Sequence, residues 1–208
     1  MKVVYVDSNK FRKTSLSNEE FCTIAIHDDF PTSIPKNEIW IDSNIKLNEI
    51  DTLLKGVIKR ISLGDSYSSY EKAQKYEKSI RNGSKSKIKK KKYISLDDGE
   101  NKIKVYFVSG KSIRDKYKTD FSQGGHGYVY NWILKDEIWI EEEEIEECTF
   151  ILAHEYVEMM MMRELGMKYE KAHGFASKIE NWFRNRKFGE HDYQKMTDNI
   201  AVLLDMVK

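Results

Sequence analysis

The chain has 208 residues, and its 35 basic and 34 acidic residues give a formal net charge of +1, which argues against a surface that binds polyanions over its whole extent. Its apolar share of 40% is ordinary for a soluble globular protein. Cys22 and Cys148 are too few for a disulfide framework, and no signal peptide or membrane span is recognisable, so a reduced, cytoplasmic setting is expected.

The first half of the chain predicts short strands followed by a helix pair. Within 47–61 the apolar residues recur at intervals of three and four, which is the pattern of an amphipathic helix. The predicted elements are strands at 2–6, 21–26 and 38–42, an irregular polar stretch at 7–20, and helices at 47–61 and 67–81.

The second half predicts the same order of elements. The acidic stretch 142–147 suits the positive N-terminal end of a following helix. Gly166 fits a left-handed position at the C-terminal end of that helix, with Met167 packing back, and Gly189 ends the next helix. The predicted elements are strands at 102–108, 128–132 and 137–141, a glycine-rich turn at 120–127, and helices at 145–165, 169–187 and 191–208.

An internal repeat explains this likeness. With an offset of 99 residues, 34–81 aligns without a gap on 133–180, and the segment Glu-Ile-Trp-Ile recurs. The fold class expected is therefore α+β, as a tandem duplication of a small unit that combines strands with a helix pair. The expected domains are 1–90 and 101–208, joined by a lysine-rich linker at 85–100, and the helix at 191–208 has no counterpart.

The two copies differ at the positions that could carry chemistry. Ligand-type side chains of the second copy align with residues that cannot replace them, so one working site is expected, in the second half. The aligned pairs are His154 with Lys55, Glu155 with Gly56, Glu158 with Lys59, and His173 with Gln74.

Six lysines crowd the segment from Lys85 to Lys92. A solvated linker or an exposed edge strand explains them. The alternative is a patch that binds nucleic acid or another anionic surface, although no interleaved aromatic residues support base stacking.

The segment from His154 to Glu158 predicts a metal site. Residues four apart lie one turn apart on the same face of a helix, so His154 and Glu158 can bind one cation together. An antiparallel return of the next helix would add His173. These three ligands form a His₂Glu set with an open position, as in catalytic zinc sites, so Zn²⁺ is the expected cofactor.

The neighbours of these ligands predict roles in hydrolysis. Glu155 can reach a water on the cation and act as general base, while the strand 137–141 could pair with an extended peptide. His126 could be a fourth ligand or a donor that stabilises an oxyanion. Because His27 takes the place of His126 under the 99-residue offset, a shared structural hydrogen bond is the other interpretation.

The motif His-Glu-x-x-Glu at 154–158, the downstream His173 and the strand-then-helix order resemble the zincin metallopeptidases. Most members of that family have histidine at the position of Glu158. The chain is also similar to small HExxE proteins of phage and prokaryotic genomes. The resemblance covers about residues 101–180 and implies a zincin-like fold and a zinc-dependent hydrolase.

The function expected is therefore peptide-bond hydrolysis, with a peptide or protein as substrate and no membrane partner. The alternative is a binding or regulatory module that zinc only braces, associated with nucleic acid through the lysines. A fourth protein ligand such as His126 would complete the coordination of the zinc and would favour this structural role.

Overall fold

The computed structural model describes residues 1–14, 21, 23–64, 67–81, 87–97, 102–185 and 198. The chain is of the expected α+β class and forms two compact units. Unit 1 contains Met1–Ile88 and Ser109–Ser122, and unit 2 contains Lys89–Val108 and Gln123–Lys208. The expected domain boundaries need correction, because 109–122 contributes to the first unit rather than to the second.

The sheet of unit 1 has three short strands, in the order β1-β3-β2. Strand β3 (Glu38–Asp42) is central, parallel to β1 (Lys2–Val6) and antiparallel to β2 (Ile24–Ile26). The stretch 7–20, expected to be irregular, instead begins with helix α1 (Ser8–Thr14), and its residues 15–20 lie outside the described ranges.

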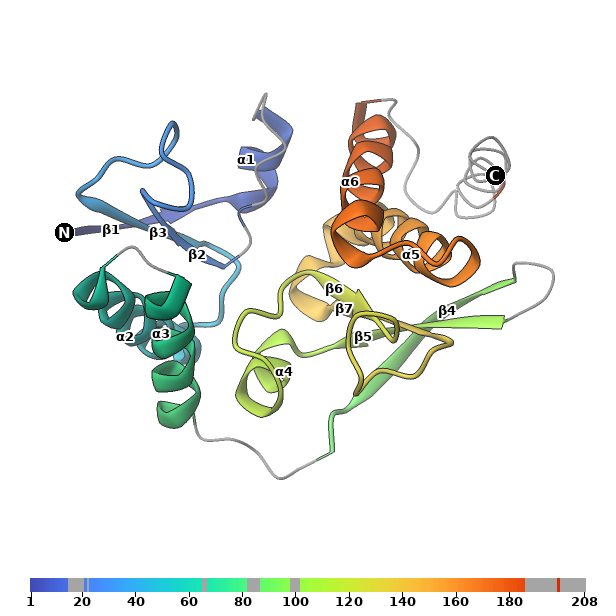
Figure 1. Ribbon diagram of the computed structural model, residues 1–208, viewed down its shortest axis with the longest axis horizontal. Helices are drawn as coiled ribbons and strands as arrows, with labels where there is room; N and C mark the ends of the chain where they lie inside the picture. The colour runs from blue at the N-terminus through green and yellow to red at the C-terminus, as the bar shows by residue number, and fades with distance from the viewer. Residues whose placement is uncertain are drawn as a thin grey trace. The chain divides into compact units, whose positions relative to one another are not determined.

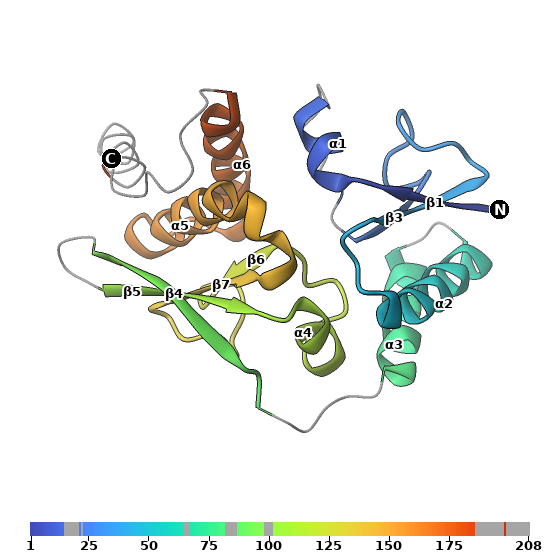
Figure 2. The same cartoon turned by 180° about the vertical axis from the view of Figure 1, so that it is seen from behind.

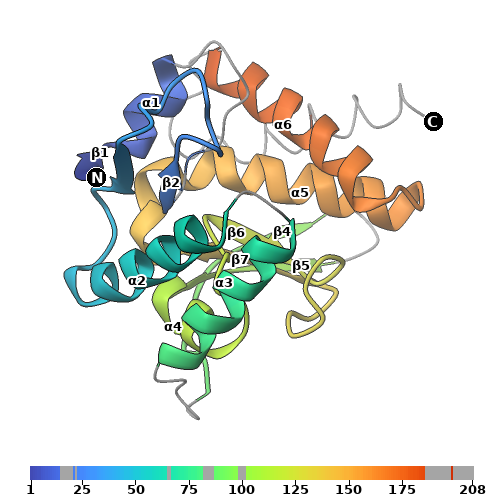
Figure 3. The ribbon, with the colours of Figure 1, turned by 60° about the vertical axis from the view of Figure 1, so that its left-hand side comes forward.

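Two helices of unit 1 confirm the amphipathic pattern. Helix α2 (Leu47–Leu63) and helix α3 (Tyr67–Ile80) pack side by side (Figures 1 and 3). Ile50 and Val57 of α2 face the strand residues Ile39 and Ile41 in one apolar cluster. Burial of this stripe is what holds the helix on the sheet.

Helix α4 (Gly110–Lys116) is fixed in unit 1 by a buried ion-pair network. The Arg114 guanidinium donates to both carboxylate oxygens of Glu49, at 2.7 and 3.0 Å, and to the Phe121 carbonyl at 2.8 Å. Arg81 donates to the same Glu49 carboxylate at 2.8 Å. Burial opposes ionisation of Glu49, but the two arginines outweigh it and lower the pKa of its carboxyl.

Replacement of Arg114 by methionine is expected to destabilise the protein at pH 7 by about 3–5 kcal/mol, because Glu49 loses a buried partner. Since the folded-state pKa of Glu49 lies below its ordinary value of 4.5, this stabilisation is present above that pH and is lost as pH falls further. Urea denaturation at pH 7 and pH 3 measures the free energy of unfolding of wild type and variant. The difference between these two free energies should be smaller at pH 3. Lys55→Met, which removes an exposed pair with Asp51, should change the free energy of unfolding far less, because solvent screens that pair.

Unit 2 has a four-stranded sheet in the order β4-β5-β7-β6. Strand β7 (Glu137–Glu141) is parallel to β5 (Lys102–Val108) and antiparallel to β6 (Gly124–His126). The expected linker 85–100 contains β4 (Lys90–Asp97), which pairs with β5 only and so is an edge strand. The glycine-rich stretch predicted as a turn supplies β6, whereas 128–132, predicted as a strand, forms turns.

The helices of unit 2 lie on one face of this sheet (Figure 2). A 3₁₀ helix, η1 (Glu142–Glu147), leads into α5 (Cys148–Glu164), and α6 (Tyr169–Asn185) follows after a tight turn. Gly166 has φ of 58°, and Met167 N donates to Met161 O at 3.2 Å, so the predicted end of the first helix is confirmed. Gly189 and the helix predicted at 191–208 lie outside the described ranges, except for residue 198.

In both units the central strand has one parallel and one antiparallel neighbour. The strand register, however, shifts the sequence alignment by one residue at β2 and β6. Ile26 pairs with Ile39, and His126 pairs with Ile138. Since the 99-residue offset matches Ile39 with Ile138, His126 corresponds by strand register to Ile26 and not to His27.

Over the described residues, no helix combines the length and apolar character that a bilayer crossing requires.

Candidate metal centre

Helices α5 and α6 bring the three predicted ligands together. His154 Nε2 lies 3.1 Å from His173 Nδ1 and 3.6 Å from Glu158 Oε2, and these last two atoms are 2.8 Å apart. His154 and Glu158 are buried, and His173 is half-buried. A triangle with these sides accommodates one atom at about 2.0–2.2 Å from each corner, which is the distance of zinc from nitrogen and oxygen ligands.

Glu180 of α6 fixes the orientation of the His154 ring. His154 Nδ1 lies 2.9 Å from Glu180 Oε2, so this nitrogen donates its proton to the carboxylate and Nε2 is directed to the ligand triangle. A carboxylate behind a metal-binding histidine sets its tautomer and raises its basicity. Burial alone would lower the pKa of His154, but the carboxylates of Glu158 and Glu180 raise it well above the ordinary value.

Glu180 is itself held by a chain of charges. Arg184 donates through Nε and Nη2 to Glu180 Oε1, at 2.9 and 2.7 Å, and through Nη1 to Glu147. Burial opposes ionisation of Glu180, but His154 and Arg184 outweigh it and lower the pKa of the carboxyl. Sequence reasoning missed Glu180, although its position two helical turns after His173 places it on the same face of α6.

His126 lies at the other side of the Glu158 carboxylate. It is fully buried, and its Nε2 is 3.0 Å from Glu158 Oε1. The backbone N–H of Tyr128 donates to His126 Nδ1 at 3.2 Å, so Nδ1 is the acceptor and Nε2 carries the proton. With its one proton directed at Glu158, the ring is placed to orient that ligand rather than to bind the cation.

The hydrogen bonds of His126 and His27 differ in their partners. His27 Nδ1 lies 2.6 Å from the Ile34 carbonyl, within unit 1, and makes a local backbone contact. His126 accepts from the backbone N–H of Tyr128, and its Nε2 also contacts a side chain 32 residues away, on α5. The two histidines therefore share neither their strand register nor their partners.

Three imidazole rings around Glu158 determine its charge. Burial of this carboxyl opposes its ionisation, but the rings of His126, His154 and His173 outweigh that effect and hold its pKa well below the ordinary value. The carboxylate is therefore ionised at neutral pH, which is the form that binds a metal.

Glu155 borders the same cluster without belonging to the ligand triangle. Its carboxylate, His126 and Glu158 each offer an atom within 4.8 Å of the others. The side chain lies against the backbone of Gly124 in β6, where an added Cβ would meet Glu155 Cγ and Oε1 at 3.1 Å. The glycine makes room for this carboxylate, so the predicted general base lies beside the centre.

The predicted peptide-pairing strand needs correction. Strand 137–141 is β7, which is hydrogen-bonded to β5 on one side and to β6 on the other. Both of its edges are occupied, so an extended peptide cannot add to it.

The lysine-rich segment is only partly free to bind an anion. Lys90 donates to both carboxylate oxygens of Glu137, at 2.6 and 2.7 Å, and lies over the Tyr106 ring at 4.5 Å. Lys91 and Lys92 are exposed on the same edge strand. Charged edge strands resist pairing with other chains, and nucleic-acid binding stays a prediction.

Comparisons of the chain with protein-family models, curated proteins and solved structures found no match. The assignment of the site therefore rests on its own geometry, which defines a candidate His₂Glu metal centre.

Proposed function

We propose that unit 2 is a zinc-dependent hydrolase that cleaves peptide bonds. The observation that carries the proposal is the convergence of His154, Glu158 and His173 on one point, with the His154 tautomer fixed by Glu180. Buried charged groups are costly unless they are paired or bind a metal. A cation bound between these three ligand atoms would meet that condition.

The residues around the ligands have separate roles in this proposal. When bound, zinc supplies Lewis-acid chemistry and makes water more acidic. Glu155 accepts a proton from the attacking water and passes it to the leaving amine. His126 holds the carboxylate of Glu158 in place. The half-buried His173 and the partly exposed Glu155 mark the side from which a substrate reaches the centre.

A zinc-braced binding module is the second candidate. The hydrogen bonds from β6 to α5, and from α5 to α6, form a connected buried network. A cation in that network would hold the helix pair on the sheet whether or not the protein turns over a substrate. The occupied edges of β7 also favour this role, because they remove one means of holding a peptide.

We also propose that the units arose by duplication and that unit 1 has lost the site. The motif Glu-Ile-Trp-Ile occupies the central strand of each sheet, and a helix pair follows each. Unit 1 has Lys55, Gly56, Lys59 and Gln74 at the aligned positions, and these residues cannot provide the same ligand set.

Metal analysis and hydrolysis assays of the untagged chain test the proposal. One zinc per chain is expected, and a chelator should abolish cleavage of casein or a peptide library, with recovery on adding zinc. A protein that holds one zinc and cleaves nothing would favour the braced module. A protein that holds no zinc after incubation with the ion would overturn both candidates.

Replacement of Gly124 by alanine is expected to lower turnover about tenfold while zinc content is unchanged. The added Cβ would lie 3.0 Å from Ile151 and 3.1 Å from Glu155, so the base must shift by a few tenths of an ångström. Small displacements of a reacting group are costly in rate. Steady-state kinetics and mass spectrometry measure the two quantities. Gly174→Ala on α6 is the matched control, since its Cβ would meet nothing within 4 Å.

A further inference from the structure

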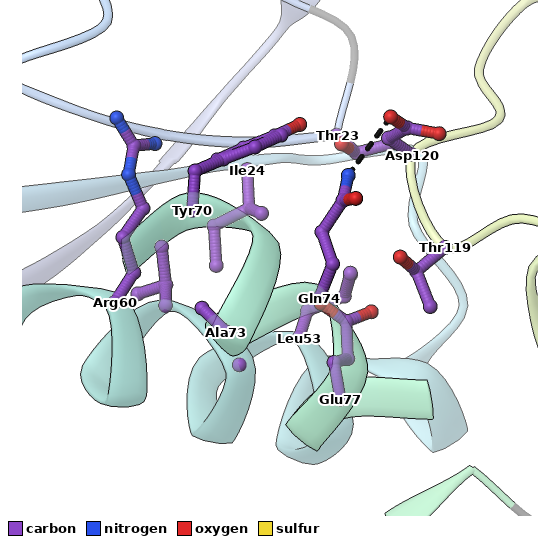
Figure 4. A pocket seen from close by; sticks show the side chains of 12 residues that line it. Thr23, Ile24, Leu53, Arg60, Tyr70, Ala73, Gln74, Glu77, Thr119 and Asp120 are labelled. Atoms are coloured by element: carbon purple, nitrogen blue, oxygen red, sulfur yellow. Dashed lines mark hydrogen bonds between the residues drawn. The ribbon is translucent and has the colours of Figure 1, made fainter. Parts of the chain in front are cut away.

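Unit 1 contains a pocket between its helix pair and its sheet, and two of the residues that line it align with residues at or beside the metal centre of unit 2. The pocket lies among α2, α3 and the start of β2, with the segment after α4 at one side, and has a volume of about 90 Å³ (Figure 4). Gly56 and Gln74, which align with Glu155 and His173, both line it. Space for several water-sized groups is enough for one amino-acid side chain.

The walls of the pocket are apolar. Leu53 and Val57 of α2, Ala73 of α3 and Ile24 of β2 line it. Tyr70 and Arg60 lie next to each other in the pocket wall (Figure 4). The guanidinium carbon of Arg60 is 5.3 Å from the centre of the Tyr70 ring. These walls fit a hydrocarbon stem better than a compact polar ligand.

A carboxylate, Glu77, lies deep in the pocket. Its side chain is 13% exposed, and its Oε1 accepts from Arg81 at 2.6 and 2.9 Å. Oε2 lies against Gly56, where an added Cβ would be 2.5 Å away. Burial raises the pKa of Glu77 because Arg81 does not fully replace the lost water. An added cation would therefore stabilise this carboxylate.

A second carboxylate, Asp120, lies at the rim. Its Oδ2 accepts from Gln74 Nε2 at 2.8 Å (Figure 4). Its Oδ1 is buried and accepts no hydrogen bond among the described residues, although the Lys118 ammonium is 3.3 Å away. The one guanidinium that lines the pocket, Arg60, already pairs with Asp29 at 2.7 Å. Two carboxylates therefore line the pocket, and the one guanidinium that lines it is already paired with an acid.

We propose that this pocket binds the side chain of a lysine presented by a peptide or protein. The four-carbon stem lies against the apolar walls, and the ammonium donates to the carboxylates of Glu77 and Asp120. An ammonium has three donors and no acceptor, which complements the two carboxylates of this pocket. This site is independent of the metal centre and of its proposed activity.

Binding of N-acetyl-lysine N-methylamide to the full chain tests the proposal. The titration is followed by NMR at the amides of Gly56 and Ala73, with a chelator present so that the metal centre has no influence. Saturable binding is expected, at least about tenfold tighter than that of the norleucine analogue, which keeps the stem and lacks the charge. The corresponding glutamate derivative should not bind.

Two isosteric variants test the carboxylates. Glu77→Gln and Asp120→Asn should each weaken lysine binding about tenfold or more, whereas Asp51→Asn, on the exposed surface of α2, should leave it unchanged. Thermal unfolding shows whether each variant is folded, and the rim variant Asp120→Asn is decisive if Glu77→Gln unfolds. Equal affinity for lysine and norleucine, tighter binding of glutamate, or unchanged affinity in folded variants would overturn the proposal.

Discussion

Replacement of Glu155 by glutamine is expected to lower peptide hydrolysis by about 10²–10⁴-fold, the usual contribution of a general base. Glutamine keeps the shape of the side chain beside Gly124 but cannot accept the proton. Zinc content should stay near one per chain, because Glu155 lies outside the ligand triangle of His154, Glu158 and His173.

The matched control is Glu146→Gln, which removes an exposed carboxylate of η1 and should leave turnover unchanged. Initial rates on a peptide library and zinc analysis on the same preparations separate chemistry from metal binding. If Glu155→Gln retains full activity, the proposed base is excluded. If it loses zinc together with activity, Glu155 contributes to holding the metal.

Two of the helices, one in each unit, were predictable from their periodicity. In α2 and α6 the apolar residues form one stripe, and Gly166 marks the turn between the two helices of the site. The spacing of His154 and Glu158 on one helix follows from helix geometry alone. These features depend on residues close together in the chain, so the sequence contains their signal.

The features that were missed depend on contacts or on local competition. The aromatics of 128–132 alternate as in a strand, yet Val129 N and Tyr130 N both donate to His126 O and close a turn. At 7–20, Asp7 Oδ1 accepts from Lys10 N at 3.0 Å and caps a short helix in a polar stretch. In each case a local hydrogen bond outweighed the residue pattern.

The partners of the site could not be read from spacing. Glu180 lies 26 residues beyond His154 and reaches it only because α6 packs against α5. The central position of β7 likewise depends on β6, a strand of three residues that includes two glycines and carries almost no strand signal. Sequence reasoning therefore identified three candidate ligands that the structure brings together, and it missed the residues that orient them.

Replacement of His154 by alanine is expected to abolish stoichiometric zinc. It removes one corner of the ligand triangle and leaves Glu158 and His173 alone. In wild type, zinc at 100 to 1,000 times its dissociation constant stabilises the fold by about 2.7–4.1 kcal/mol, because the folded chain binds it and the unfolded chain does not. Urea denaturation with zinc and with chelator should show this difference in wild type and none in the variant.

Two further variants make this prediction specific to the centre. His27→Ala removes a histidine of unit 1 whose Nδ1 contacts the Ile34 carbonyl, and it should leave zinc stabilisation intact. Glu180→Gln keeps all three ligands but weakens the acceptor behind His154, so zinc affinity should fall about 10–100-fold without being lost. Unchanged zinc content in His154→Ala would exclude the centre. Loss of zinc in His27→Ala would instead place the metal in unit 1, because that histidine lies outside the ligand triangle.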